Sequence, residues 1–251
     1  MAYNGSAFYD DDEVFKTYMA RRQRADNPND TMEKPVILEL IGEFTNQRIL
    51  DLGCGDATFG QEALTKGCQT YLGIEGSINM VNSAQETLAG TNGKVVQAAI
   101  ENWDYPTQAF DLVVSRLVLH YIKDIDAIFS QVNRTLSNNG RFVFSIEHPV
   151  ITSCDRAWQG NGKRQEWLVD NYFDTGQRIT SWMGGQVFKY HRTVENYFIS
   201  LQRAGFSIES LREAEPQREQ FENDAETYQR RKRIPLFLIM AGQKNSAQKR
   251  A

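Results

Sequence analysis

The stretch RILDLGCGDATFG, residues 48–60, decides the fold. An apolar run ends near Asp51, two glycines follow at Gly53 and Gly55, and a helical pattern comes next. Glycine suits such a turn because it adopts positive φ and lets a ligand approach the backbone closely. The next glycine is Gly60, so the spacing departs from the dinucleotide pattern GxGxxG and favours a cofactor without a pyrophosphate.

Short apolar runs alternate with helical patterns on both sides of this stretch. The strand-like runs are 48–52, 70–74, 94–98, 110–114 and 141–146, with helix-like stretches at 57–66, 77–88 and 125–136; a helix at 193–204, a strand from about 206 and a strand at 236–241 follow. Runs without polar alternation are typical of parallel strands covered on both faces. The order therefore predicts a doubly wound, mostly parallel, Rossmann-like α/β sheet.

Two segments do not follow this alternation. Residues 1–46 form an acidic leader with a predicted helix at 14–24, a polar break at 26–30 and a second helix before the first strand. Residues 150–192 are rich in Trp, Tyr, Gly and Arg and show little periodicity, which indicates a lid inserted after strand five. We expect residues 47–251 to form the sheet domain with this lid inserted, preceded by the leader at 1–46.

Composition excludes some classes of protein. The 251 residues carry 28 Lys and Arg against 32 Asp and Glu, a net charge of −4. The chain therefore has no overall positive charge that would attract nucleic acid or an anionic membrane. Three cysteines, an odd number, suit reduced thiols in the cytoplasm. We find no secretion signal, no run of 18 apolar residues and no metal-ligand spacing, so a cytoplasmic protein without a membrane span is expected.

Two further motifs follow the next predicted strands. Glu75 lies 22 residues after Gly53 at a strand end, where a carboxylate accepts hydrogen bonds from both ribose hydroxyls. This feature alone does not separate NAD from S-adenosylmethionine. In AAIENW, residues 98–103, the backbone N–H of Ile100 and the carboxylate of Glu101 are placed to meet an adenine edge.

These motifs together resemble a known family. DLGCG, Glu75 followed by S-x-x-M, FDLVVSRLVLHYIKD (110–124) and NNGRFVFSIEHP (138–149) are similar to class I S-adenosylmethionine-dependent methyltransferases of the UbiE/type 11 group. The resemblance covers nearly the whole chain, including Y-x-x-R and N-D-x-x-E-x-P in the leader. It implies a seven-stranded sheet with an antiparallel last strand, S-adenosylmethionine as cofactor and S-adenosylhomocysteine as product.

The resemblance also implies a set of cofactor-binding residues. Arg21 would form a fork with the methionine carboxylate, a contact that suits guanidinium geometry; the alternative is a leader helix with Arg21 in solvent. The implied residues are Tyr18, Arg21, Asp51, Gly53, Gly55, Glu75, Ser77, Met80, Ile100, Glu101, Ser115 and His120.

The acceptor side is less defined by the sequence. Arg116 stands where the family often has a small residue, which places a cation near the pocket mouth. Lid aromatic residues either wall a pocket for the acceptor or pack a small satellite core, and His148 and His191 either act as catalytic bases or anchor the lid. The predicted pocket residues are Arg116, Trp158, Tyr172, Trp182 and Tyr190.

The predicted activity is methyl transfer to an O, N, S or C nucleophile of a small-molecule acceptor by in-line displacement, performed by a monomer or homodimer. Nucleic acid is not expected as a partner. The alternatives are methylation of tRNA or rRNA, for which Arg230 to Arg233 is the sole basic patch, and a cofactor-binding sensor without catalysis. A nicotinamide-dependent dehydrogenase is a weaker third alternative.

Overall fold

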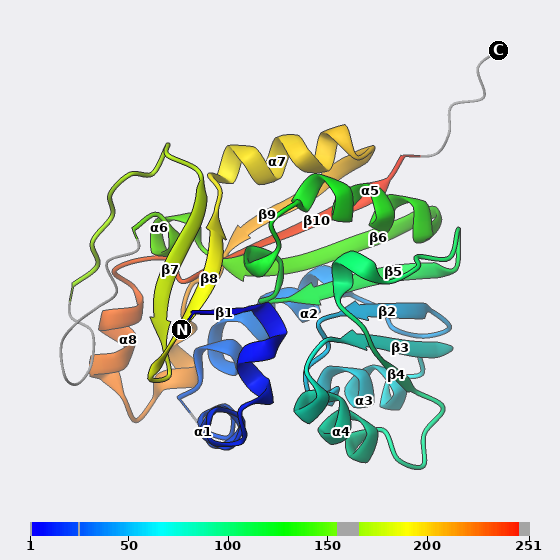
Figure 1. Cartoon of the computed structure of the whole chain (residues 1–251), viewed down its shortest axis with the longest axis horizontal. Coiled ribbons are helices and arrows are strands. Elements are labelled where there is room, and N and C mark those ends of the chain that lie inside the picture. The colour runs from blue at the N-terminus through cyan, green and yellow to red at the C-terminus, as the bar shows by residue number, and fades with distance from the viewer. Residues whose placement is uncertain (1, 25, 155–165, 246–251) are drawn as a thin grey trace.

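The computed structural model describes residues 2–24, 26–154 and 166–245, and its centre is a seven-stranded sheet of order β4-β3-β2-β5-β6-β10-β9 (Figure 1). Strand β10 runs antiparallel to both neighbours and the other six strands are parallel, which confirms the predicted doubly wound fold. The strands are β2 (Arg48–Leu52), β3 (Thr70–Glu75), β4 (Lys94–Gln97), β5 (Phe110–Arg116), β6 (Leu136–Glu147), β9 (Phe206–Glu213) and β10 (Phe237–Lys244).

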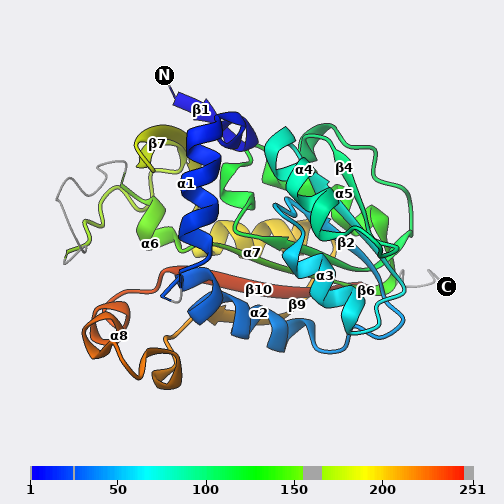
Figure 2. The ribbon, with the colours of Figure 1, turned by 90° about the horizontal axis from the view of Figure 1, so that it is seen from below.

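Helices cover both faces of this sheet (Figures 1 and 2). One face carries α5 (Ile125–Thr135) and α7 (Val194–Arg203), and the other carries α2 (Lys34–Ile41), α3 (Thr58–Thr65) and α4 (Ile78–Thr87). The side chains of Ser77 and Asp124 accept hydrogen bonds from the first turns of α4 and α5 and so cap these two helices. No helix in the described ranges is long and apolar enough to span a membrane.

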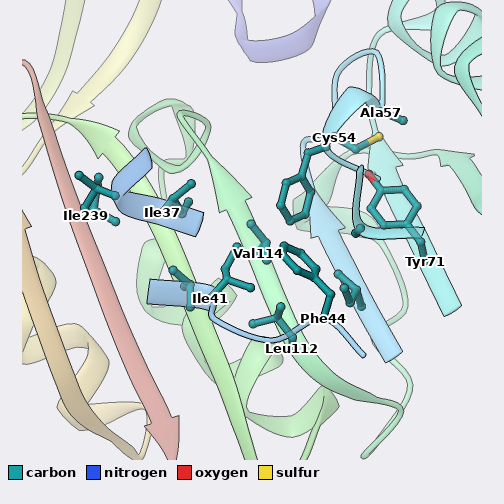
Figure 3. Close-up of a cluster of buried hydrophobic side chains, with 14 of the residues drawn as sticks. Ile37, Ile41, Phe44, Cys54, Ala57, Tyr71, Leu112, Val114 and Ile239 are labelled. Carbon is teal, nitrogen blue, oxygen red and sulfur yellow. The ribbon is translucent and has the colours of Figure 1, made fainter. Parts of the chain in front are cut away.

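The core beneath α2 joins the leader to the sheet (Figure 3). Ile37 and Ile41 of α2 are at most 1% exposed and belong to one buried cluster with Leu112 of β5 and Ile239 of β10. Burying an aliphatic side chain of this size contributes about 1.5–3 kcal/mol. The second half of the leader is therefore part of the domain core.

The first half of the leader is built differently. It consists of a short strand, β1 (Ala2–Asn4), a 3₁₀ helix, η1 (Gly5–Asp10), and α1 (Asp12–Arg22), followed by a π-helical turn, η2 (Asn29–Glu33), that leads into α2. The helix predicted for residues 14–24 is present. Strand β1 was not predicted.

The lid segment contains regular structure that its sequence did not reveal. Strands β7 (Gly176–Trp182) and β8 (Gly185–His191) form an antiparallel hairpin, and β1 pairs in parallel with β8 to give a second sheet of order β1-β8-β7. We call residues 2–22 and 176–191 together the roof. The remaining short elements are α6 (Pro149–Thr152), α8 (Ala225–Arg231), η3 (Ile100–Asn102), η4 (Leu119–Tyr121) and η5 (Arg218–Phe221).

Candidate active site

A cavity of about 320 Å³ lies at the carboxyl ends of β2, β3 and β5, the edge where open α/β sheets bind ligands. The leader part of the roof closes it through Tyr9 and Tyr18. Eight of the residues predicted to bind the cofactor line this cavity: Tyr18, Asp51, Gly53, Gly55, Glu75, Met80, Ile100 and Glu101.

The glycine loop leaves its backbone open toward the cavity. Gly53 and Gly55 have φ values of 75° and 56°, which favour glycine. A Cβ atom on Gly53 would lie 2.4 Å from a methyl group of Val118, so no side chain fits there. The N–H groups of Gly53 and Cys54 donate to the carbonyl of Ile74 at 2.8 and 3.2 Å, which fixes the loop.

Glu75 joins this loop to the end of β3. Its carboxylate is 7% exposed and accepts hydrogen bonds from the N–H groups of Gly55 at 2.9 Å, Gly76 at 2.8 Å and Ser77 at 2.9 Å. Burial raises the pKa of the Glu75 carboxyl, and these three donors oppose the rise. Because a carboxylate offers about four acceptor positions and three are used, Glu75 retains about one position, on Oε2, for a ribose hydroxyl.

Asp51 lies deeper at the end of β2. Tyr71 donates to its Oδ2 at 2.7 Å, whereas its buried Oδ1 has no hydrogen-bond partner among the described residues. Burial raises the pKa of Asp51 to about 7. The cavity wall therefore holds a carboxyl group with one unused acceptor atom.

An apolar slot closes the other end of the cavity. Ile100, the first residue of η3, is 6% exposed and Met80 of α4 is 3% exposed, and both line the cavity. The hydroxyl of Tyr105 donates to the Ile100 carbonyl at 3.0 Å and fixes this turn. Together with the exposed carboxylate of Glu101, this end suits a planar base with polar edges.

The leader is attached directly to the cavity rim. Asp10 accepts from the N–H of Ile78 at 2.9 Å, and the side-chain amide of Asn79 donates to the Tyr9 carbonyl at 3.1 Å. Ser6 lies so close to Gly76 that a Cβ atom there would be 2.3 Å from the Ser6 hydroxyl. These contacts hold η1 over the end of β3.

Comparisons with known proteins agree with this geometry. A family described as "Methyltransferase domain" matches residues 50–144. The crystal structure of an S-adenosylmethionine-dependent methyltransferase from Mesorhizobium loti is 32% identical, with 89% of this chain and 99% of that chain covered and a TM-score of 0.77. A Listeria monocytogenes structure assigned to the same class is 34% identical, with 85% and 97% covered and a TM-score of 0.78.

The chain belongs to the S-adenosylmethionine-dependent methyltransferases. An uncharacterized protein of Haemophilus influenzae is a further relative, 31% identical over 221 residues, which are 84% of this chain and 87% of that protein. The methyltransferase therefore uses S-adenosylmethionine as its methyl donor, as the resemblance implied. Within the described residues, no group of three or more His, Cys, Asp and Glu side chains is arranged to hold a metal ion.

Four of the predicted cofactor residues lie outside the lining of this methyltransferase's cavity. The guanidinium carbon of Arg21 lies 4.6 Å from the ring centre of Trp182 in the roof. Ser77 caps α4, and the hydroxyl of Ser115 donates to the Leu52 carbonyl at 2.9 Å. His120 is buried behind the cavity, and burial lowers its pKa to about 3.

Both candidate catalytic histidines hold backbone in place. His148 Nδ1 accepts from the N–H of Val150 at 3.2 Å and so caps α6, and its Nε2 lies 3.0 Å from Glu213. His191 is fully buried, with Nδ1 2.9 Å from the hydroxyl of Thr152 and Nε2 2.9 Å from the Tyr172 carbonyl. Burial lowers the pKa of both imidazoles, so they are neutral near pH 7.

The predicted pocket residues divide in a similar way. Arg116 lines the cavity, whereas Tyr172, Trp182 and Tyr190 do not. The Tyr172 hydroxyl accepts from the N–H of Val194 at 3.3 Å, and Tyr190 borders a second, more open hollow beside α7. Trp158 lies outside the described residues.

Several lining residues were missed by sequence reasoning. Tyr9 and Arg22 of the leader, Phe59 of α3 and Tyr121 of η4 all line the cavity. Tyr121 follows His120 in the motif FDLVVSRLVLHYIKD, so the sequence does mark the segment in which it lies. No periodicity marked Tyr9, because its position depends on the contact between η1 and α4.

Proposed function

We propose that this methyltransferase methylates a small organic acceptor inside the cavity. The observation that carries the proposal is the closure of the cavity by the leader, where Tyr9 and Tyr18 cover the glycine loop. An acceptor that reaches the methyl group must fit beneath this roof. The net charge of −4 further disfavours RNA as the acceptor.

The cavity suits the cofactor from end to end. Gly53 and Gly55 line the cavity without side chains, and Glu75 is placed for a ribose hydroxyl. The slot at Ile100 and Met80 suits the adenine ring. Bound there, S-adenosylmethionine supplies a methyl group on a positively charged sulfur, which leaves as a neutral thioether.

The chain's own contribution is to position the acceptor and exclude water. Holding nucleophile, methyl carbon and sulfur in line supplies about 7–11 kcal/mol of the barrier reduction. Tyr9, Tyr18 and Tyr121 border the space left beside the cofactor. Burial raises the pKa of all three phenols, so they stay protonated at neutral pH.

We infer the expected nucleophile from the two predicted bases, because neither His148 nor His191 lines the cavity. His148 Nδ1 caps α6, and both ring nitrogens of His191 are engaged in contacts within the lid. An alcohol gains roughly 10²–10⁴-fold from a base, whereas a carboxylate, thiol or amine needs little help at neutral pH. We therefore expect an acceptor of the second kind.

The test is incubation of the protein with methyl-labelled cofactor and either a small-metabolite extract or bulk tRNA and rRNA. We expect label in the metabolite fraction, identified by mass spectrometry, and background counts in RNA. Glu75→Ala is the matched control, because it should abolish labelling of any acceptor. Label confined to RNA, or absent from both fractions in a protein that binds the cofactor, would contradict the proposal.

A further inference from the structure

Arg116, the last residue of β5, lines the cavity. Its side chain is 14% exposed, and its guanidinium carbon lies 5.8 Å from the ring centre of Phe59. Arg116 is thus held between the sheet and the start of α3. A guanidinium in such a position is ordered before any ligand binds.

A buried carboxylate fixes this guanidinium. Arg116 Nε lies 3.1 and 3.2 Å from the two carboxylate oxygens of Glu33, and Nη2 donates to the same group. Glu33 is fully buried, and the hydroxyl of Ser145 donates to its Oε1 at 2.7 Å. The pair therefore ties the leader to the ends of β5 and β6.

This arrangement leaves one nitrogen of Arg116 available. Nε and Nη2 are used by Glu33, and within the described residues Nη1 makes no hydrogen bond. A guanidinium carries five N–H donors, two of them on Nη1. Since Arg116 lines the cavity, these two donors are free to meet a ligand oxygen.

The order of strands in the sheet indicates which part of the cofactor lies near Arg116. Along the edge, the strands follow β4-β3-β2-β5, with Ile100 after β4, Glu75 on β3 and Arg116 on β5. Neighbouring strands are about 4.8 Å apart, so Glu75 and Arg116 lie about 10 Å apart along the edge. A cofactor with its ribose at Glu75 and its base at Ile100 extends its amino-acid end toward β5.

That end of the cofactor complements the wall beside Arg116. An α-amino acid carries a carboxylate and an ammonium group side by side. The wall offers the free Nη1 donors of Arg116 and the unpartnered Oδ1 of Asp51. Arg21, to which the resemblance gave the carboxylate contact, lies against Trp182 instead.

We propose that Arg116 Nη1 binds the carboxylate at the amino-acid end of the cofactor, and that the Glu33–Arg116 pair makes the protein select cofactors that carry this end. The inference rests on the cofactor placement described under the proposed function and is independent of the acceptor. Arg22 is the competing candidate, because it also lines the cavity, with its Nη2 3.9 Å from Asp30.

The experiment compares two ligands that differ in the amino-acid end. S-adenosylhomocysteine carries it and 5′-methylthioadenosine lacks it, and their affinities are measured by calorimetry. The key variant is the double substitution Glu33→Gln with Arg116→Gln, which avoids leaving Glu33 buried without a partner. Arg22→Gln tests the competitor, and Arg24→Gln, which removes an exposed pair with Asp26 at 2.9 Å, is the control.

We expect the double variant to bind S-adenosylhomocysteine about 10- to 100-fold more weakly and 5′-methylthioadenosine within twofold of wild type. Retained nucleoside binding shows that the variant is folded. Unchanged affinity for both ligands, an equal loss for both, or a selective loss only in Arg22→Gln overturns the inference. Label found in RNA in the earlier test would overturn the small-molecule acceptor and leave this result standing.

Discussion

The cofactor edge of the sheet and the roof above it are held by different kinds of contact. At the edge, the glycine loop and Glu75 are 20 positions apart and are joined through backbone N–H groups. In the roof, β1 pairs with a hairpin more than 180 positions away, and Arg21 rests on the ring of Trp182. The edge is local in sequence, and the roof is assembled from distant segments.

Because of this difference, we expect the cofactor edge to govern cofactor binding and the roof to govern how the cavity is closed. The edge uses backbone geometry that a single side chain would block, so substitutions there should act on cofactor affinity. The roof uses buried side chains, so substitutions there should act on stability and on the access of water to the cavity. Four experiments test whether the two regions can be separated in this way.

The largest effect is expected for Gly53→Val. The new side chain would occupy the space of the Val118 methyl groups at a positive φ, so cofactor affinity should fall at least about 100-fold. Gly67→Ala is the matched control, since Gly67 also has a positive φ of 86° but nothing lies within 4 Å of its Cβ position. Calorimetry with S-adenosylhomocysteine measures both. Equal losses in the two variants would show that backbone strain, and not cavity shape, decides affinity.

Phe8→Ala tests the centre of the roof. Phe8 is 1% exposed and lies so close to Gly185 that a Cβ atom there would be 2.6 Å from its ring. Truncating a buried phenylalanine costs about 3–5 kcal/mol, and hydrogen exchange should rise in residues 5–10 and 185–191. Phe198→Ala, at a site 38% exposed, should change neither quantity much. Unaltered exchange in the hairpin would mean that the roof does not act as one unit.

A smaller loss is expected for Lys189→Met. Lys189 is buried and its Nζ lies 2.7 Å from both carboxylate oxygens of Glu147, which is 21% exposed and so reached by some water. Losing this ion pair should lower the free energy of unfolding by about 2–3 kcal/mol in denaturant titrations. Lys16→Met breaks the exposed pair with Glu13 and should cost less than about 1 kcal/mol. Similar costs for both variants would refute a special role for the buried pair.

The last experiment concerns pH. The pKa of His120 falls from 6.5 to about 3 on burial, so the unfolded chain binds a proton that the folded chain excludes. The contribution of His120 to the free energy of unfolding is therefore fully present above pH 6.5 and is lost as the pH falls below it. Thermal melts from pH 7.5 to 4.5 should show this decline, and His120→Gln should flatten it. Equal slopes in both proteins would remove His120 from the pH dependence.

The cofactor edge could be predicted because its information is local. Gly53, Glu75 and Ile100 each follow a strand that the apolar runs reveal, and parallel strands bring their carboxyl ends together. The N-caps Ser77 and Asp124 were likewise readable from residue type and position. A repeating alternation of strand and helix leaves few ways to place such residues.

The roof could not be predicted for the opposite reason. The partner of β1 is 184 residues distant, and the burial of Phe8 depends on a glycine in the hairpin. His191 looks like a base in sequence, yet the side chain of Thr152 and the carbonyl of Tyr172 occupy its two nitrogens. The spacing of residues along the sequence predicts none of these contacts, because each joins segments that are far apart in the chain.

The pairing of β1 with β8 also sets an order of events during synthesis. Residues 2–4 leave the ribosome long before their partners at 186–188, which emerge only after β2 to β6 have been made. The edge that binds the cofactor has all its strands well before the roof has its second half. The nascent chain therefore passes through a stage in which the strands of the cofactor edge have been made while the leader half of the roof still lacks the hairpin that pairs with it.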